Sequence, residues 1–573
     1  MTAAAAQPRR EGGSLQALFQ RIAASDRLSV LALMLFALLT FTPGFTTLPP
    51  TDRDESRFAQ ASKQMLESGD FVAIRFQDEA RLKKPVGIYW LQALAVSAGE
   101  ALGVEKARTT IALYRIPSLC AALGAVFLTW WAGLPLAGRR AALLAGLMMA
   151  GSFLLNIEAR LAKTDATLLF TVLAMMGVLA RLWAGRAETA PETRSRWLLP
   201  GIFWTAAALS VLIKGPIGPM VPAFTIAAVV VTTREWRWLA GLRWLPGLVW
   251  MLVLVSPWFI AIMVQTKGAF LQQSLGNDML SKVAGGKEGH GAPPGTYLAA
   301  AQFFFWPFAP LAIVAVPWVW RNRRQASVLF LLAWLVPFWL VFEVVPTKLP
   351  HYVLPAYPAL ALLVSAALVD DGLARRLWAR IVTLLVPLLA LALPLALMGA
   401  GYWFDHVVIW WLLPFAVVAV MLAVLAWRRL GAGQGEAGVL LSALAALTLF
   451  WGLGWVAIPA VPSIWPAPRL MEIAQRATCK SPHFTSLGLR EPSLVFAGGT
   501  DLQMADNPGE AAAFLAGAGG ACRIAFVEQA SESAFSAALT ASAAKATLLG
   551  RAHAVNLNGN KPVEMGVYEA AAP

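Results

Sequence analysis

Residues 51–90 read TDRDESRFAQ ASKQMLESGD FVAIRFQDEA RLKKPVGIYW. Between Thr51 and Lys84 this stretch carries seven acidic and seven basic side chains, whereas most of the surrounding sequence is nearly uncharged. Charged groups that lie against a membrane are costly unless they are paired or bind a ligand. The stretch is therefore a candidate functional site, and the plainer alternative is a solvated surface loop.

The rest of the 573-residue chain is strongly apolar. Hydrophobic residues make up 58% of it, charged residues only 14%, and the mean hydropathy is +0.62. Soluble proteins carry about 25% charged residues, so we expect a polytopic α-helical membrane protein. Thirteen apolar windows have roughly the 17 to 25 residues that a spanning helix needs. They are 28–48, 109–136, 141–157, 166–184, 197–213, 217–232, 244–264, 299–319, 327–345, 353–369, 381–400, 407–426 and 439–461.

Basic residues recur at every second connection between these windows, which indicates the cytoplasmic side of each loop. The N-terminal tail, residues 1–27, is polar and basic, resembles no cleavable signal, and is expected in the cytoplasm. The net charge of +14 therefore reflects topology, and we do not expect a nucleic-acid partner. The basic positions are Arg9, Arg10, Arg21 and Arg27, then Arg139–Arg140, 181–196, 234–243, 321–324, 375–380 and Arg428–Arg429.

The predicted domains follow from this pattern. Residues 28–461 form the transmembrane domain, with a charged first outer loop at 49–108, and residues 462–573 form a small α/β domain on the periplasmic side. Within the small domain, helices are expected at 466–478, 507–517 and 530–545, and strands at 481–489, 492–499, 522–529 and twice within 548–570. Cys479 and Cys522 both lie there, where a disulfide is chemically permitted, although their spacing alone does not establish one.

The first outer loop itself contains two predicted surface segments. Phe58, Ala61, Met65 and Leu66 recur at helical spacing, which predicts an amphipathic helix along the membrane surface. The apolar segment 86–102 is expected to be interfacial or re-entrant, because a further span there would reverse the side of every later loop.

Three charged clusters fall on the predicted outer side. Carboxylates and cations at a lipid boundary suit a reaction in which one group is deprotonated while an anionic leaving group is stabilised. The phosphate of a lipid carrier fits that leaving group, since nucleotide sugars are not generally available outside the cytoplasmic membrane. The sequence shows no His/Cys metal-ligand spacing, no G-x-S-x-G and no Walker motif. The clusters are Asp54, Glu55 and Arg57; Asp165 with Glu158, Arg160 and Lys163; and Lys84 with Lys348 and His351.

Several motifs resemble the GT-C membrane glycosyltransferases of the protein-mannosyltransferase-like superfamily, and among them the lipid A aminoarabinose transferases in particular. The motifs are DESRFA with MLxSGDF in the first outer loop, KKPVxIYW after it, RLAKTDA, and KLPHYVLPAYP. The resemblance covers essentially the whole chain, and the first loop is its most specific part. It implies a GT-C fold of about thirteen spans with a small C-terminal periplasmic domain.

The resemblance also implies roles for single residues. Asp54 is the expected catalytic base or acceptor-orienting acid, and Asp165 is the second acidic residue, with Glu55 beside Asp54 as a further catalytic candidate. A polyprenyl-phosphate sugar is the expected donor, and transfer is expected to invert the anomeric carbon without a covalent intermediate. The expected substrate-binding residues are Lys84 for the phosphate, with Arg57, Tyr89, Lys348, His351 and Tyr352.

Two positions depart from the family pattern. Phe58 stands where a tyrosine is common, and Lys83 stands where aminoarabinose transferases can carry a carboxylate. We therefore do not expect a metal site of their kind. The sequence indicates no cofactor, and it leaves another divalent metal site as an open alternative.

Each assignment has a structural alternative. Asp54 and Glu55 could pair with Arg57, and Asp165 could cap a helix after Thr164. Lys214 could extend from the end of a span towards the headgroups. Tyr89 could be an interfacial anchor, and Lys348 with His351 could bind headgroups only.

The expected function is transfer of a sugar to lipid A or another envelope lipid or saccharide, by a monomer in the bacterial inner membrane. A protein O-mannosyltransferase-like enzyme is the alternative. A lipid-linked sugar transporter or flippase is a third, which would place ionisable residues near the middle of the bilayer, whereas here the charges gather at one edge.

Overall fold

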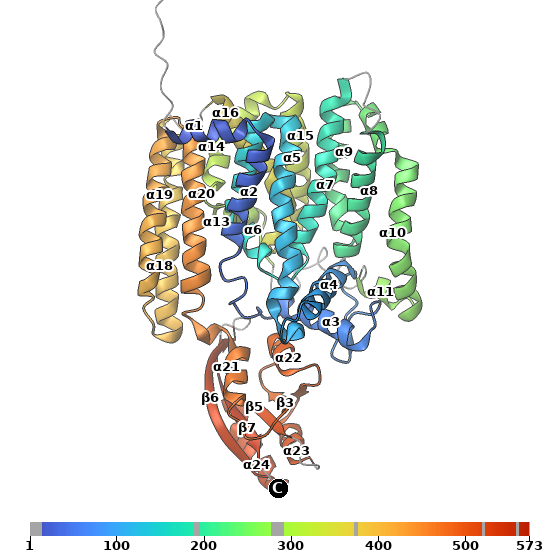
Figure 1. The fold of residues 1–573 in the computed structure, drawn as a ribbon, viewed down its shortest axis with the longest axis vertical. Coiled ribbons are helices and arrows are strands. Elements are labelled where there is room, and N and C mark those ends of the chain that lie inside the picture. Colours follow the sequence, from blue (N-terminus) through green and yellow to red (C-terminus); the bar gives the residue numbers. More distant parts are fainter. Residues whose placement is uncertain are drawn as a thin grey trace, which may run out of the picture.

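The computed structural model describes residues 14–187, 195–274, 276, 291–371, 376–517, 522–556 and 561–571. Residues 1–13 of the predicted cytoplasmic tail therefore lie outside the described residues. Two parts are visible, a helical bundle and a smaller sheet domain that hangs from one end of it (Figure 1). This confirms the predicted fold class, a polytopic helical protein with a small C-terminal α/β domain.

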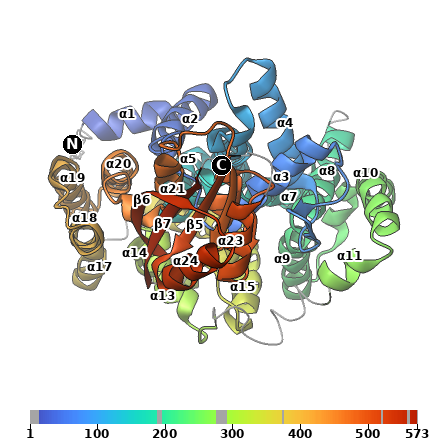
Figure 2. The same cartoon turned by 90° about the horizontal axis from the view of Figure 1, so that it is seen from below.

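The bundle is built from long apolar helices, of which α7 is the most enclosed. In α7, 83% of the apolar window is buried, compared with 22% in α10 and α19, which lie at the rim (Figure 2). Groups at the ends of α7 are therefore held by neighbours on all sides. The helices are α1 (Ser14–Ala23), α2 (Asp26–Phe41), α5 (Ile111–Gly151), α6 (Phe153–Ala159), α7 (Asp165–Ala184), α8 (Ser195–Lys214), α9 (Ile217–Thr233), α10 (Trp244–Gln265), α11 (Ala269–Leu271), α13 (Thr296–Phe304), α14 (Ala309–Asn322), α15 (Ala326–Val344), η5 (Pro350–Ala356), α16 (Tyr357–Asp371), α17 (Leu377–Thr383), α18 (Leu385–Asp405), α19 (Leu413–Gly431) and α20 (Gly435–Gly452).

Nine helical segments of the described residues are long and apolar enough to cross a membrane. One of them, α5, holds two of the expected spans, because Gly138 breaks it with a φ of +77°. A Cβ on Gly133 would lie 3.1 Å from the Cβ of Ala142, so the two halves of α5 fold back on each other. The nine therefore cover ten of the thirteen expected windows, and the other three windows hold the shorter or broken helices α2, α9 and α13 with α14.

Two short helices lie under the bundle, beside the C-terminal domain (Figure 1). The predicted amphipathic helix is α3 (Asp54–Ser68), which buries Phe58, Ala61 and Met65. A two-stranded hairpin, β1 (Arg75–Phe76) and β2 (Glu79–Ala80), leads from it to α4 (Gly87–Ala101). With only 15 residues, α4 is shorter than a spanning helix.

The C-terminal domain is a five-stranded mixed sheet with helices packed against it. Its strand order is β4-β3-β5-β7-β6, with β3 parallel to β4 and β5, and with β7 antiparallel to β5 and β6. Two apolar clusters form its core, so the domain has an interior of its own. The elements are α21 (Pro466–Ala474), β3 (His483–Leu487), α22 (Pro492–Gly498), β4 (Gln503–Ala505), α23 (Pro508–Ala516), β5 (Arg523–Glu528), α24 (Glu532–Ala541), β6 (Ala546–Asn556) and β7 (Lys561–Ala570).

One prediction for this domain is wrong. The strand expected at 492–499 is helix α22, and the short strand β4 that follows it was not expected. Pro492 occupies the first turn of α22, where its missing N–H costs nothing and its fixed φ suits a helix. Leu494, Val495 and Phe496 are all buried because α22 is enclosed between the sheet domain and α3.

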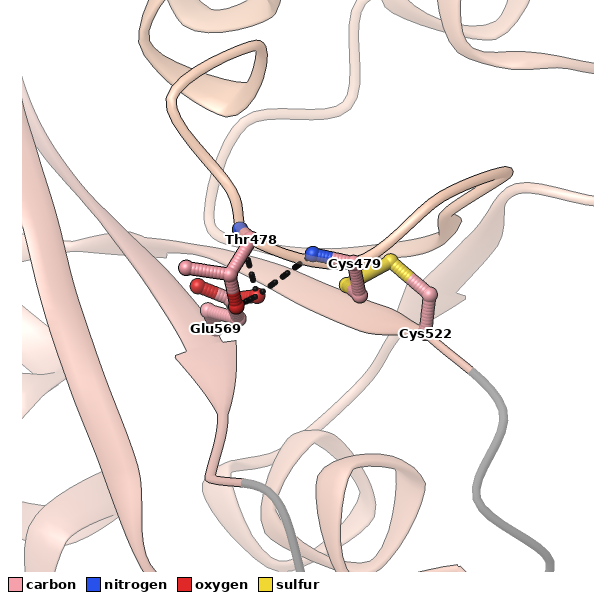
Figure 3. The surroundings of a disulfide bond; sticks show 4 residues. All are labelled: Thr478, Cys479, Cys522 and Glu569. Atoms are coloured by element: carbon pink, nitrogen blue, oxygen red, sulfur yellow. Dashed lines mark hydrogen bonds between the residues drawn. A yellow bond between two sulfur atoms is a disulfide. The ribbon is translucent and has the colours of Figure 1, made fainter.

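A disulfide joins Cys479 and Cys522, whose Cα atoms are 5.3 Å apart (Figure 3). It ties the segments that enter the parallel strands β3 and β5, where the His483 amide also donates to the Cys522 carbonyl. Next to it, one carboxylate oxygen of Glu569 accepts hydrogen bonds from the Thr478 amide, the Thr478 hydroxyl and the Cys479 amide. The start of the sheet is therefore held both covalently and by a buried acceptor.

Replacing both cysteines of this bridge with serine should destabilise the C-terminal domain. The bridge closes a separation of 43 residues, and the chain entropy that such a closure removes corresponds to about 4 kcal/mol. We expect limited proteolysis to cut residues 462–573 of the double variant at a lower temperature than in the wild type. The matched control is Cys120→Ser, which removes the free thiol. Equal protease resistance of the double variant and the wild type would contradict a stabilising bridge.

Candidate active site

A buried ion pair fixes the start of α3. Glu55 is 1% exposed and Arg115 on α5 is 2% exposed, with 2.7 Å between Arg115 Nε and Glu55 Oε1. The same carboxylate accepts from the amide and hydroxyl of Thr51 and from the Ala162 amide, at 2.7 to 3.0 Å. Arg115 also donates to the carbonyls of Phe45, Leu48 and Pro49. Three separate segments are thereby locked to one another: the loop after α2, the first turn of α3 and the loop before α7.

Asp54 is the residue that this lock leaves exposed. It is the first residue of α3, next to the fully enclosed Glu55. The preceding residue, Arg53, has φ 65° and ψ −97°, close to the strained γ-turn conformation that side-chain-bearing residues rarely adopt. Strained backbone persists where the surroundings hold it, and such positions cluster at functional sites. The geometry is that of a carboxylate turned away from the core.

Five ionisable side chains meet beside the N-terminus of α7. Lys163 Nζ lies 2.9 Å from Glu158 Oε1 and 3.7 Å from Asp165 Oδ2. Lys214, the last residue of α8, donates a hydrogen bond to the other oxygen of Asp165. His351 on η5 lies 3.8 Å from Glu158 and 3.8 Å from Asp165. Two carboxylates and two ammonium groups therefore form a compact, charge-balanced cluster around one imidazole.

The electrostatics of the loop groups agree with this arrangement. Burial lowers the pKa of Lys163, but the charges of Glu158 and Asp165 outweigh burial and raise that pKa above its ordinary value. Burial raises the pKa of Glu158, against the opposing charge of Lys163. The negative charge of Asp54 also helps to raise the pKa of Lys163, so the carboxylate on α3 and the cluster are electrostatically linked.

The structure brings most of the predicted residues to this place. Lys84 lies close enough for its charge to act on His351. Tyr352 stacks edge-on against His351 with ring centroids 5.1 Å apart, and Lys214 Nζ lies 5.6 Å from the Tyr352 ring. Asp165, His351 and Tyr352 thus meet at the cluster, and the charges of Asp54 and Lys84 act on its members, although the five residues come from four separate parts of the chain.

Three other predicted residues are committed elsewhere. Lys348 Nζ donates to the carbonyls of Phe342, Glu343 and Val345 at 2.9 to 3.0 Å, which caps the end of α15. Tyr89 is fully buried against Phe58, and its hydroxyl accepts from Arg81 Nε at 3.3 Å. Glu55 is enclosed by Arg115, as described above. All three roles are structural in this geometry.

The comparisons with known proteins agree with the geometry. Residues 28–271 match the family described as dolichyl-phosphate-mannose-protein mannosyltransferase. The undecaprenyl phosphate-alpha-4-amino-4-deoxy-L-arabinose arabinosyl transferase of Pseudomonas aeruginosa strain UCBPP-PA14 is 30% identical over 417 residues, which cover 72% of this chain and 71% of that protein. The chain belongs to this family of arabinosyl transferases. It is a membrane glycosyltransferase that depends on a lipid-linked sugar.

Two further matches extend the comparison. The transferase of the same name from Edwardsiella ictaluri strain 93-146 is 27% identical over 325 residues, which cover 54% of each chain. The crystal structure of ArnT from Cupriavidus metallidurans bound to undecaprenyl phosphate superposes with a TM-score of 0.73 at 20% identity, covering 95% of this chain and 98% of that one. That second likeness shows the shared GT-C fold, including the C-terminal domain.

The sequence did not indicate a role in the site for two lysines of this transferase, Lys163 and Lys214. Lys163 was noted only as a neighbour of Asp165, and Lys214 was interpreted as a lysine at the end of a span. The usable signal for Lys163 was four charges within the eight residues 158–165, far more than a short connector needs. For Lys214, the only signal was its position directly before Gly215 and Pro216, which is too common to be decisive.

Three members of the cluster have the donor atoms of a metal site. Glu158, Asp165 and His351 offer donor atoms that all lie within 4.8 Å of one another. However, Lys163 and Lys214 already neutralise the two carboxylates, and a divalent cation there would face both ammonium groups at close range. A divalent cation bound here would therefore have to displace at least one of the two ammonium groups.

Removing either partner of the Arg115–Glu55 pair should destabilise the transferase. Breaking a buried pair leaves an uncompensated charge and typically costs about 3 to 5 kcal/mol. We expect Glu55→Ala and Arg115→Ala to lower the thermal unfolding temperature, and the double variant to lose less than the sum of the two. A Glu55→Gln protein with wild-type stability and no turnover would instead return Glu55 to the chemical step.

Proposed function

We propose that this protein transfers a sugar from a polyprenyl-phosphate carrier to lipid A or another envelope lipid or saccharide. Reaction takes place at the periplasmic face of the bacterial inner membrane, with the N-terminus in the cytoplasm. The relatives are named for undecaprenyl phosphate-linked aminoarabinose, which supports the donor class. The alternation of basic loops and the disulfide of the C-terminal domain support the orientation.

One observation carries the proposal: the charge of an exposed carboxylate, Asp54, acts on a buried cluster that holds two ammonium groups. A base and a set of cations are what the displacement of a phosphate from a sugar requires. Lys84, whose charge acts on His351 of the cluster, supplies positive charge where an anionic carrier departs, and Lys163 and Lys214 supply N–H donors there.

The reaction follows from these positions. Asp54 accepts the proton of the acceptor oxygen, or orients that oxygen, as it attacks the anomeric carbon. The bond from that carbon to the carrier phosphate breaks, the electron pair stays on the phosphate oxygen, and Lys84 stabilises the charge. Attack from the face opposite the phosphate inverts the anomeric carbon, so no covalent glycosyl-enzyme forms and one carboxylate base suffices.

Asp165 and Glu158 serve as positioning residues in this scheme. Asp165 holds Lys214 and Lys163 in place, and Glu158 holds Lys163 from the other side. Among the described residues, Glu158 Oε2 is buried without a hydrogen-bond donor, so a sugar hydroxyl would have to enter the cluster to bind it. Tyr352 packs against His351 and Lys214 of the cluster and would contact the substrate, whereas Arg57 follows Asp54 by one turn of α3.

A protein acceptor is the second candidate. It is favoured by the match of residues 28–271 to the protein mannosyltransferase family. The proton abstraction and phosphate departure described above would be the same, so only the acceptor distinguishes the two candidates.

Replacing Asp54 with asparagine should abolish transfer and leave folding intact. Loss of a general base typically costs 10²- to 10⁴-fold in rate, so we expect turnover at least about 100-fold lower, because a side-chain amide cannot take the proton. The measurement is transfer of a radiolabelled sugar from a polyprenyl-phosphate donor by purified protein. Asp52→Asn is the matched control two residues away, since an asparagine oxygen can still accept the bond from the Ser493 amide. Wild-type turnover of the Asp54 variant would remove it from the mechanism.

The same variant identifies the acceptor. Lipid A, phospholipids and envelope proteins are compared by mass spectrometry between cells carrying the wild type and cells carrying Asp54→Asn. A mass shift in lipid A or another glycolipid supports the first candidate, and a shift confined to proteins supports the second.

Chelators should leave the transfer rate unchanged. The cationic groups at the cluster are the ammonium groups of Lys163 and Lys214, which no chelator removes. We expect turnover within about twofold of the untreated enzyme after EDTA treatment and dialysis, whereas a metal that supplied the charge would be worth several kcal/mol of barrier. Loss of activity that is restored by one added divalent ion would contradict this expectation.

A further inference from the structure

A large polar cavity lies between the first outer loop and the C-terminal domain. Its volume is about 1300 Å³, and its walls include Arg57, Lys83 and the β1–β2 hairpin on one side, with Arg490 and β4 on the other. Small-molecule pockets typically measure about 300 to 1,000 Å³, so this cavity exceeds the size needed for one sugar ring. No role for it follows from the reaction described so far.

The cavity exists because the C-terminal domain docks on the first loop. Gln77, in the hairpin turn, donates to the carbonyls of Leu502 and Thr500 at 2.6 and 3.2 Å. Gln60 on α3 donates to the Thr500 hydroxyl at 2.8 Å, and that hydroxyl donates to Glu67 at 2.7 Å. The walls are therefore held together by specific hydrogen bonds, and neither half encloses the space alone.

The cavity lies close in sequence and structure to the start of α3, where the proposed catalytic base stands. Arg57, which lines it, stands three residues after Asp54 on α3, and residues at that spacing lie on the same face, about one helical turn apart. Arg81, which also lines it, donates to the hydroxyl of Tyr89. The cavity wall at Arg57 therefore lies about one helical turn from Asp54.

The lining chemistry suits a charged saccharide. Five basic and four acidic side chains line the cavity, a mixture that favours neither a purely anionic nor an apolar ligand. Carboxylates and carbonyls accept hydrogen bonds from sugar hydroxyls, while arginine and lysine bind phosphate or carboxylate groups through charge-assisted hydrogen bonds. Lys83 is exposed at the rim, on the segment that leads to Lys84.

We infer that this cavity binds the head group of the acceptor, a saccharide of more than one ring that carries anionic groups such as phosphate, and that the C-terminal domain supplies half of the recognition. This inference rests on the proposed sugar transfer. It gives the C-terminal domain a role in acceptor specificity, with Arg490 and Lys83 as binding residues on opposite walls.

The test uses the full-length enzyme with two charge-removing variants, Arg490→Gln and Lys83→Gln. Both side chains are exposed, and Arg490 pairs only with the exposed Asp506 and a backbone carbonyl in the described contacts, so folding should survive. Arg476→Gln is the matched control, an exposed arginine of the same domain outside the cavity lining. Initial rates are measured against acceptor concentration and, separately, against donor concentration.

We expect each cavity variant to raise the KM for the acceptor about fivefold to tenfold, which corresponds to one weakened charge-assisted hydrogen bond. The KM for the donor should stay at the wild-type value, and the control should change neither. A wild-type acceptor KM in both cavity variants, or an equal rise in both KM values, would overturn the assignment.

A direct binding measurement separates this inference from the proposed function. Titration calorimetry with the deacylated, water-soluble phosphosaccharide of lipid A needs no turnover, and we expect the wild type to bind it and Arg490→Gln to bind it several-fold more weakly. Binding of only the intact glycolipid, with equal affinity for both proteins, would place recognition in the lipid part and refute the cavity. If no sugar is transferred to any acceptor but the phosphosaccharide binds in this way, the proposed reaction fails while the cavity assignment stands.

Discussion

The pairing of Arg115 with Glu55 is the interaction on which the site depends. A charge buried in a bundle of apolar helices is tolerated only with a partner and with its remaining hydrogen-bonding groups satisfied. Both conditions are met here, because Arg115 also binds three carbonyls of the loop after α2 and Glu55 also binds the amide before α7. Since both side chains are already saturated, the adjacent Asp54 is turned outward and stays accessible. Of these two neighbouring carboxylates, Glu55 therefore has a structural role and Asp54 is the one accessible to a substrate.

The same division recurs at the cluster beside α7. This helix is the most enclosed of the bundle, and its first residue, Asp165, is only 5% exposed. Its negative charge at the helix N-terminus is favoured by the helix dipole and by two lysines from different segments. The lysines are held in turn by the carboxylates, Lys163 mainly by Glu158 and Lys214 by Asp165. A preorganised set of charges of this kind stabilises a departing anion without having to rearrange during the reaction.

Much of this architecture could be predicted from the sequence. Hydropathy located the spans because a helix needs a long apolar run to cross a membrane. The spacing of Phe58, Ala61 and Met65 located α3. The convergence of Asp54, Lys84 and Asp165 followed from shared motifs and from the sidedness of their loops. Each of these signals depends on neighbouring residues or on the side of the membrane that a loop faces, so a single sequence is enough to detect it.

The remaining roles depended on partners far away in the chain. Glu55 resembled a second catalytic acid because nothing near it reveals Arg115, which follows sixty residues later. Lys348 lies in a proline-rich motif that resembles the family pattern. Its ammonium group nevertheless donates its hydrogen bonds to carbonyls at the end of the preceding helix, α15. Residues 492–499 have a composition typical of a strand. The segment α22 is buried on both sides, so its apolar pattern does not distinguish a helix from a strand. Pairing across long separations cannot be deduced from one sequence.

The docking of the C-terminal domain has a consequence for biosynthesis. The contact between Asp52 and Ser493 joins residues 441 positions apart, and that between Gln60 and Thr500 joins residues 440 apart. At translation rates of about 5 to 20 residues per second, the first loop waits roughly 20 to 90 seconds for the segment that completes it. A ribosome-bound chain with all its spans inserted still lacks the far wall of the cavity. The site of the newborn enzyme is therefore complete only after its last domain has been translated and has folded.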